Sequence, residues 1–343
     1  MELSSRKRAV LEAIVRAYIE TGEPVGSKIL TELMENAPSS ATIRNEMSEL
    51  TSLGLLEQPH VSAGRVPTTD AYRLFVNSFM RMSELNDSTK EYIDSLLSDV
   101  AVDAEKLRIR SAEILSALTG FTAFCYNSVD SDVTLKRVEV LKISRHSLML
   151  FMLTSDGRTR NSVCRLDTPF TAELKEQLEG IIKTRLYRKP LCELNKAYLQ
   201  NVVALSGLNS FLLMQPLTQL FNMADDAAQS RIYIGGNSCA YNVFGEDKAR
   251  RVLSLLSRAE PISSICDELQ GDSSVIFGDD TPYADLKNTV MAVSKYGKAD
   301  KSTGGIGIIA SDRMSYEQIV PSVEYLASRL THILKEFKKD MED

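Results

Sequence analysis

The sequence has little of the residues that build disulfide frameworks and zinc clusters. Its five cysteines include no Cys-x-x-Cys pair, and its three histidines lie far from one another. We therefore expect no disulfide, no metal site and no cofactor, and a reducing cytoplasm is the natural compartment. Small buried hydrophobic residues are the better interpretation for Cys125, Cys164, Cys192, Cys239 and Cys266.

Long hydrophobic runs are also absent. The longest, residues 148–153, has the length of a strand, whereas a membrane helix needs roughly 18–20 apolar residues. Arg6, Lys7 and Arg8 precede apolar residues as in a signal peptide, but Glu12 and Arg16 interrupt the apolar run that follows. We expect neither a membrane span nor a signal peptide.

An excess of positive charge, the usual mark of a nucleic-acid-binding protein, is missing too. The 343 residues carry a net charge of −6, and the first 83 hold nine Lys and Arg against ten Asp and Glu. Any DNA-binding surface must therefore depend on where the cations are placed. The length predicts two or three domains, and 43% hydrophobic with 25% charged residues is typical of a globular protein.

Two amphipathic helices are predicted at the start of the chain. Between residues 5 and 21 the apolar side chains recur with helical spacing, and Gly22 and Pro24 end the pattern. A second helix is predicted from Ser27 as its N-cap. Its predicted buried side consists of Ile29, Leu30, Leu33 and Met34.

A third helix is predicted from a cap at Ser39 or Ser40 to about Leu53, with Gly54 after it. Its outer face carries small or hydrogen-bonding side chains, as a helix in the major groove requires. Slim side chains allow close approach, Asn can pair with adenine, and Arg with guanine or phosphate. The residues predicted to contact DNA here are Ser40, Ala41, Thr42, Arg44, Asn45 and Ser48, together with Lys28 of the second helix.

A β-wing is predicted over residues 55–67, where two short strands flank a glycine turn. Arg65 is expected near its tip, where it would suit a phosphate or the minor groove, and His60 and Ser62 can donate hydrogen bonds beside it. Thr68 is the predicted cap of a further helix.

Each of these features alone has a simpler interpretation, because a solvated helix face explains Thr42, Arg44 and Asn45 as well as DNA contact does. Their order is what indicates a winged helix-turn-helix: two helices, a third with a polar outer face, then a hairpin with a basic residue.

Three stretches resemble the signature of the HrcA family: TGEPVGSKIL at 21–30, SSATIRNEMSELTSLGLL at 39–56 and QPHVSAGRVPTTDAYRLFV at 58–76. Ala71 departs from the glycine that is usual in the family. The resemblance implies a bacterial heat-shock repressor, a homodimer that binds an inverted-repeat operator before chaperone genes and loses activity on heat stress. It also implies the GroE chaperonin as a partner that keeps the repressor active.

The resemblance further implies an α+β domain similar to the GAF fold, interrupted by a dimerisation insert. Together with the helix and strand patterns, this predicts an α+β multidomain protein. We predict a winged helix-turn-helix over 1–83, a helical connector over 84–118, the first part of the GAF-like domain over 119–189, an inserted dimerisation domain over 190–270, and the second part of the GAF-like domain over 271–343.

No catalytic arrangement can be assembled from the sequence, and we expect no enzyme. Gly304, Gly305 and Gly307 form half of a dinucleotide fingerprint, but an apolar strand follows where a helix is required, so a β-turn is expected. Asp279 and Asp280 lack a third ligand and are expected in a solvated loop. The alternative left open is a winged-helix repressor whose GAF-like domain senses a small molecule.

Overall fold

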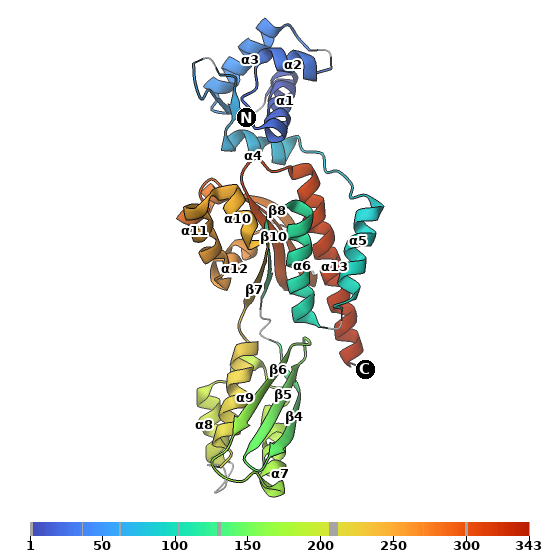
Figure 1. The fold of residues 1–343 in the computed structure, drawn as a ribbon, viewed down its shortest axis with the longest axis vertical. Helices are drawn as coiled ribbons and strands as arrows, with labels where there is room; N and C mark the ends of the chain where they lie inside the picture. The colour runs from blue at the N-terminus through green and yellow to red at the C-terminus, as the bar shows by residue number, and fades with distance from the viewer. Residues whose placement is uncertain are drawn as a thin grey trace.

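The computed structural model describes residues 3–35, 37–61, 63–101, 103–128, 132–205, 212–269, 271–298 and 301–342. Three units follow one another along the long axis of the molecule (Figure 1). We call them the winged-helix unit (4–78), the central unit (87–127 with 231–342) and the three-stranded unit (133–229). No helix of the described part is long and apolar enough to cross a membrane.

The winged-helix unit forms because its capping residues and apolar spacing agree. Ser39 and Thr68 cap two of its helices by accepting backbone N–H bonds, and Gly22 ends another in the left-handed conformation (φ 72°). The elements are α1 (Ser5–Thr21), α2 (Ser27–Leu33), α3 (Ser40–Ser52), β1 (Leu56–Glu57), β2 (Val66–Pro67) and α4 (Thr69–Ser78). The predicted winged helix-turn-helix is confirmed.

Helix α2 differs from its prediction in its cap and its buried face. Gly26 holds the cap position, and the Ser27 hydroxyl instead lies 2.9 Å from the Ser40 hydroxyl at the start of α3. Only Leu30 is fully buried; Ile29 and Leu33 are 48% and 58% exposed. A helix of seven residues presents too narrow a stripe to bury four apolar side chains against one neighbour.

The central unit is a five-stranded antiparallel sheet in the order β7-β3-β10-β9-β8. Its strands are β3 (Thr122–Asn127), β7 (Arg231–Gly235), β8 (Ser273–Phe277), β9 (Val290–Lys298) and β10 (Lys301–Ala310). Helices α6 (Ala104–Thr119) and α13 (Tyr316–Glu342) cover one face, with α5 (Asp87–Ser98) packed against both. Helices α10 (Asn237–Phe244), α11 (Glu246–Leu256) and α12 (Ala259–Asp267) cover the other.

Strand β3 shows the effect of this double cover, because every one of its residues is buried. Ala123 and Cys125 pack towards α6 and α13, while Phe124 and Tyr126 pack towards α11 and α12. Helix α6 contributes Leu107 to the same core, so the segment predicted as a connector is a core helix of the central unit.

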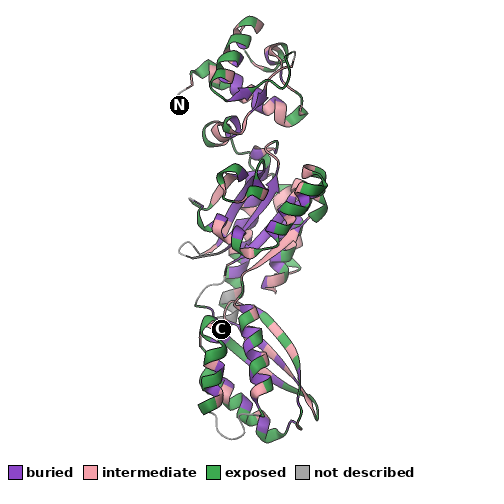
Figure 2. Cartoon of the chain, turned by 90° about the vertical axis from the view of Figure 1, so that its left-hand side faces the viewer, coloured by how far each residue is buried: buried purple, intermediate pink, exposed green. Residues whose placement is uncertain are grey.

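The three-stranded unit has its own sheet and its own core. Its elements are β4 (Leu135–Ser144), β5 (Ser147–Thr154), β6 (Thr159–Arg165), α7 (Ala172–Ile181), a π-helix (Ile182–Leu186), a 3₁₀ turn (Leu191–Glu193), α8 (Lys196–Leu205) and α9 (Met214–Ala227). Burial alternates strictly along β5, because the helices cover only one face of this sheet (Figure 2).

The predicted insert at 190–270 is therefore wrong in its boundaries. Strands β4 to β6, assigned from the sequence to the GAF-like domain, pair only with one another, and the interruption runs from about residue 133 to 229. Residues 231–267 return to the central unit as β7 and α10–α12. Alternation reveals that a segment is a strand but not which strand it pairs with.

The glycines at 304–307 are also placed differently from their prediction. They lie inside β10, between β3 and β9, and not in a turn. At Gly307 an added Cβ would lie 2.5 Å from the Ala292 carbonyl oxygen, so the close approach of the neighbouring strand requires glycine there.

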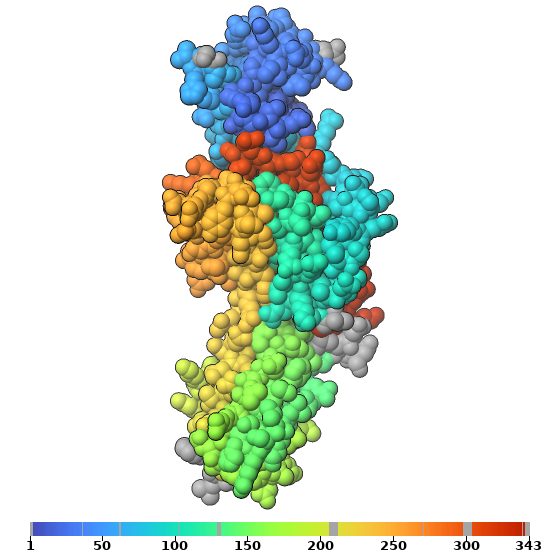
Figure 3. All heavy atoms as spheres, viewed as in Figure 1, coloured from blue at the N-terminus to red at the C-terminus, as the bar shows by residue number. Residues whose placement is uncertain are grey.

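A narrow neck joins the central and three-stranded units (Figure 3). Arg231 and Arg160 both bind Asp226, at 2.6 and 2.7 Å, and both bind Glu105, at 2.9 and 2.8 Å. The four side chains come from β7, β6, α9 and α6, so this ion network connects both units at the neck.

Candidate nucleic-acid interface

Helix α3 turns a polar face outwards because its apolar residues hold it in the core. Ile43 and Leu50 are completely buried, and Met47 is 5% exposed. Arg44 and Asn45 are exposed on the other side, and neither side chain makes a hydrogen bond or ion pair with any described residue. Ala41 and Ser48 lie on the same exposed face. The α3 surface therefore combines free donors and acceptors with room for close approach.

The first turn of α3 is fixed by its own hydroxyl groups. The Ser39 hydroxyl accepts the Thr42 backbone N–H at 3.2 Å and lies 2.9 Å from the Thr42 hydroxyl. Ser40 is engaged with Ser27, as described above, and the Ser48 hydroxyl donates to the Arg44 carbonyl at 3.0 Å. Of the predicted contact residues, Ser40, Thr42 and Ser48 therefore orient the helix, while Arg44 and Asn45 remain available.

The cations of the winged-helix unit differ in whether an acidic side chain pairs with them. Lys7 binds Glu49 at 2.7 Å, Arg16 binds Glu317, and Arg73 binds Asp280 at 2.5 Å. Lys28 and Arg44 have no acidic partner within the residues that the structure describes. Positive charge is therefore mostly neutralised on α1 and α4, where only Arg8 lacks an acidic partner among the described residues, and is left free on α2 and α3.

Arg65 does not lie at the tip of the wing, as predicted, but at its base. Its backbone forms two 2.9 Å hydrogen bonds with Val25, and its guanidinium donates to the Thr51 hydroxyl of α3 at 3.1 Å. Next to it, a Cβ on Gly64 would lie 2.4 Å from the Val25 carbonyl oxygen. The β-bridge to the α1–α2 loop holds this part of the wing close to the helices.

The tip of the wing consists of residues 59–61 as far as the structure describes it. His60 and Val61 are exposed, and the Ala63 N–H donates to the His60 carbonyl to close the turn. Gln58 spans the turn, since its amide donates to the carbonyl oxygens of Val61 and Ala63 at 2.9 and 3.1 Å. Ser62, predicted to contact DNA, lies outside the described residues.

The winged-helix unit is held to the central unit by ion pairs and by contacts between aromatic rings. Arg16 of α1 makes two hydrogen bonds to the Glu317 carboxylate of α13, one of them 2.7 Å long. Burial alone would raise the pKa of Glu317, but the hydrogen bonds from Arg16 and from the Arg81 backbone N–H, together with the charges of both arginines, outweigh it and lower that pKa. Tyr72 and Phe75 of α4 pack against Tyr316 in tilted and edge-to-face arrangements, with ring centroids 6.0 and 6.4 Å apart.

These contacts between units could not be found in the sequence. Arg16 and Glu317 are 301 positions apart, and no local pattern marks either. Asp280, expected in a solvated loop, binds Arg73 of the winged-helix unit.

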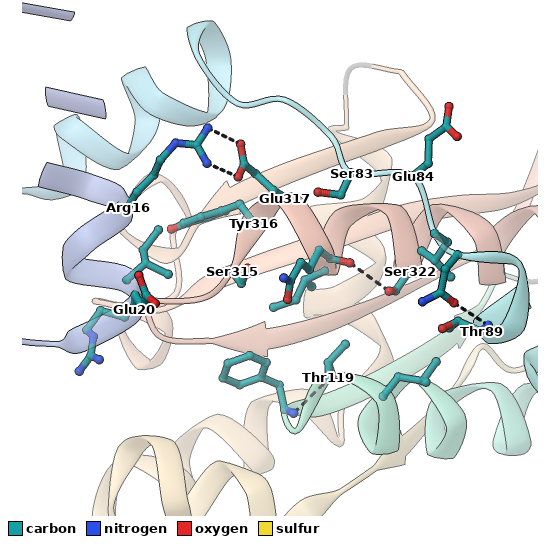
Figure 4. Close-up of a pocket in the computed structure, with 18 of the residues that line it drawn as sticks. Arg16, Glu20, Ser83, Glu84, Thr89, Thr119, Ser315, Tyr316, Glu317 and Ser322 are labelled. Carbon is teal, nitrogen blue, oxygen red and sulfur yellow. Dashed lines mark hydrogen bonds and ion pairs between the residues drawn. The ribbon is translucent and has the colours of Figure 1, made fainter. Parts of the chain in front are cut away.

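A cavity of about 860 Å³ lies at the same joint, between α1, the segment 83–86, the end of α6 and the start of α13 (Figure 4). Several of its polar groups are already satisfied by the protein. The hydroxyls of Thr119 and Ser322 donate to carbonyls of their own helices at 2.7 and 3.0 Å, and Arg16 binds Glu317. The cavity therefore shows no set of free convergent groups, among the residues described, that would indicate a ligand.

The described residues contain no group of three or more His, Cys, Asp or Glu that could hold a metal ion. Burial raises the pKa of the Cys125 and Cys266 thiols to about 12, so both are protonated and unreactive at neutral pH. Cys192, expected to be buried, is exposed.

Two family models cover most of the chain. The winged helix-turn-helix transcription repressor model, HrcA DNA-binding, matches residues 2–80, and the HrcA protein C terminal domain matches residues 105–320. The chain belongs to the HrcA family. The resemblance seen in the three sequence stretches is thus confirmed, and this HrcA protein is a member of a transcription repressor family.

Full-length relatives agree with this assignment. The heat-inducible transcription repressor HrcA of Brevibacillus brevis is 30% identical over 98% of this chain and all of that protein. The protein of the same name from Carboxydothermus hydrogenoformans is 28% identical over 97% of this chain and 98% of its own. A crystal structure of a hypothetical protein covers 98% of this chain and 100% of its own with a TM-score of 0.68 at 22% identity, which supports the fold. A winged helix followed by an α+β domain, consistent with a GAF-like fold, is the confirmed architecture.

Proposed function

We propose that this HrcA protein represses heat-shock (chaperone) genes in the cytoplasm by binding an inverted-repeat operator as a homodimer. The observation that carries the proposal is the sorting of charge in the winged-helix unit. Lys28 and Arg44 are left unpaired, among the described residues, beside the exposed Asn45. Most cations on α1 and α4 are instead bound to acids, and the remaining one, Arg8, lies over the Phe79 ring. A surface that binds DNA needs free donors on one face.

The residues divide by role in this proposal. Asn45 and Arg44 read base edges in the major groove, and Lys28 neutralises a phosphate. Ala41 permits close approach, and Ser40, Thr42 and Ser48 orient the helix and can contact the backbone. His60, Ser62 and Arg65 belong to the wing, with Arg65 acting at its base. The site is thus a binding surface and not a catalytic centre.

A homodimer is proposed because one winged helix with so few free cations has few phosphate contacts to contribute. Two copies related by a twofold axis would double them and match an inverted repeat. The uncovered face of the three-stranded sheet is the surface that we assign to this contact. Leu141, Met149 and Val163 lie side by side across β4, β5 and β6, and Val163 is 62% exposed. An apolar row of this kind is buried in many dimers.

Selection of bound duplexes from a random DNA pool tests the proposed function. A recovered inverted repeat, lost when Lys28 and Arg44 are both replaced by Ala, is the expected result. Recovery of no preferred sequence would contradict it.

The regulation that we propose is the family's: the GroE chaperonin maintains the active repressor, and heat removes this support. The structural feature that supports this regulation is the sheet of the central unit, where β3 must pair with β7 across an insert of about 100 residues. Closing such a long loop slows folding and prolongs the exposure of unpaired strands. After mild heating, operator binding should return only with chaperonin and ATP. Unaided recovery would favour the alternative, in which the GAF-like domain senses a small molecule.

A further inference from the structure

Strand β8 forms an outer edge of the central sheet, and its backbone is unpaired on that side. Just after the strand, the Gly278 N–H donates to the Thr289 carbonyl at 2.7 Å. Just before it, the Lys295 N–H of β9 donates to the Asp272 carbonyl at 2.6 Å. Since bonded positions alternate along an antiparallel pair, the N–H and C=O groups of the residues between them point away from β9. These residues are Ser273, Val275 and Phe277, and no described strand pairs with them from the outer side.

The other edge strands of the two larger sheets carry features that discourage pairing with another chain. Basic side chains lie along each of them: Lys136, Arg137 and Lys142 in β4, Arg160 and Arg165 in β6, and Arg231 in β7. Strand β4 also has two register shifts. In β8 all five residues are uncharged, none is proline, and the register with β9 is regular. An edge without charge, proline or bulge is open to an added strand.

The side chains of β8 would give an added strand apolar neighbours on both faces of the sheet. Val275 packs against the core on the side of α6 and α13, and Ile276 against the core on the side of α11 and α12. Neither side chain is fully buried, so a neighbouring strand would remove apolar surface from water on both faces. A segment that binds here should therefore carry apolar or β-branched residues in its middle.

Exposed acidic side chains flank β8 at both ends. Glu268 and Asp272 precede the strand and Asp279 follows it, and none of the three has an ion pair with a described residue. Lys295 lies opposite Asp272 on β9, but its ammonium donates to the Leu269 carbonyl at 3.0 Å. A bound segment should therefore carry Lys or Arg at both of its ends.

We propose that β8 binds an extended segment of another protein as an added strand, with apolar residues in the middle of that segment and basic residues at its ends. A second copy of this chain is disfavoured, because antiparallel self-pairing centred on Val275 would bring Asp272 of each copy close to Asp279 of the other. The added strand would lie beside α4, whose Arg73 stands 5.3 Å from the centre of the Phe277 ring. Binding at this edge needs no DNA and is independent of the proposed function.

The charge preference can be measured with the synthetic peptide KRVTVTVKR, labelled for fluorescence anisotropy and titrated with the full-length protein at low salt. The peptide EEVTVTVEE keeps the middle and reverses the ends, and the parent should bind it roughly tenfold more weakly. Asp272→Lys combined with Asp279→Lys should reverse this preference. Glu173→Lys combined with Glu176→Lys, at exposed residues of α7, gives the same change in net charge and should keep it. Equal affinity of the parent for both peptides would overturn the inference, and so would an unchanged preference in the first double variant.

The backbone pairing is tested by Val275→Pro. Because the Val275 N–H points away from β9, proline removes a donor from the outer edge without breaking a bond of the ladder. The variant should keep the circular dichroism spectrum of the parent and lose most of its affinity for KRVTVTVKR. A folded Val275→Pro protein that binds this peptide as the parent does would overturn the inference. If proline prevents folding, the charge-reversed variant decides the question.

Hydrogen exchange locates the bound peptide. KRVTVTVKR should slow exchange in residues 273–277 and leave the opposite edge, residues 231–235, unchanged. Protection at another place instead would overturn the inference. A parent that dimerises in the absence of peptide and becomes a monomer in Val275→Pro would assign this edge to a second copy of the chain, which also overturns it.

Discussion

Asn45 illustrates how single side chains are prepared for recognition on this surface. It is exposed on a helix whose opposite side is buried in the core through Ile43 and Leu50. Its amide therefore faces solvent and makes no hydrogen bond to any described residue. Ser52 lies on the same helix, but its hydroxyl donates a hydrogen bond to the Ser48 carbonyl at 3.1 Å. The distinction between a residue that reads DNA and one that supports a helix depends on such partners.

Asn45→Ala should therefore weaken operator binding by roughly 1–3 kcal/mol and relax base choice at one position per half-site. The measurement is a titration of operator duplexes that carry each base at every position of one half-site. Ser52→Ala is the control and should change neither quantity. An Asn45→Ala protein with the affinity and base preferences of the parent would show that α3 does not read bases through this residue.

The wing depends on one close approach between chain segments. Gly64 lies where its missing side chain lets the Val25 carbonyl approach, and a Cβ would be 2.4 Å from that oxygen. Since the contacting atoms belong to the backbone, they cannot move aside as a flexible side chain could. Gly26, on the same loop, is different, because a Cβ added there would meet no atom within 4 Å.

Gly64→Ala should displace the wing from the α1–α2 loop and destabilise the winged-helix unit by about 1–3 kcal/mol. Thermal unfolding followed by circular dichroism measures the loss, and Gly26→Ala is the matched control with a smaller expected change. Equal effects of the two substitutions would mean that the Val25–Arg65 bridge does not hold the wing.

The two sheets differ in how many of their faces are covered by helices. The sheet of the central unit is covered on both faces, whereas the sheet of the three-stranded unit leaves one face open to a partner. Strand β3 is buried throughout between two helical layers, whereas β5 is fully buried only at alternate positions. The uncovered side of β5 and its neighbours is available for a second copy of the chain.

Val163→Lys should consequently yield a monomer without loss of folding, because the side chain is 62% exposed in a single chain. Light scattering would report the mass, and operator affinity should fall with it because each monomer contacts only one half-site. Leu205→Lys places the same charge at an exposed apolar residue (63%) of α8 and should leave the dimer intact. A Val163→Lys protein that remains dimeric would move the interface elsewhere.

At the scale of the whole molecule, the Arg16–Glu317 pair connects the DNA-binding unit to the longest helix of the central unit. The lowered pKa of Glu317 means that the pair stabilises the docked arrangement above the ordinary pKa of the carboxyl, about 4.5. This stabilisation is lost as the pH falls through the lowered value, when the carboxyl takes up a proton. Arg73 and Asp280 support the same joint.

Glu317→Gln should loosen this joint at neutral pH at a cost of about 1–2 kcal/mol, since both partners are partly exposed to solvent. The rate of limited proteolysis in residues 79–86 measures the loosening, and the parent should approach the rate of the variant only below pH 4.5. Glu84→Gln, in the same segment and without an ion pair to any described residue, is the control. A parent whose proteolysis shows no dependence on pH on either side of that value would rule out a role for the pair.

The sequence alone determined the winged-helix unit, because its signals are local. A cap acts within three residues, as Ser39 and Thr68 do, and the apolar spacing of α1 and α3 needs only one buried side. The tertiary structure decided what depends on distant partners: that β4 to β6 form a separate sheet, that Arg65 sits at the base of the wing, and that Arg16 meets Glu317. Alternation of apolar and polar residues predicts a strand but not the strand with which it pairs. Likewise, a basic residue in the sequence does not show which acidic residue neutralises it. The free cations of α2 and α3 could be recognised only once the paired ones were known.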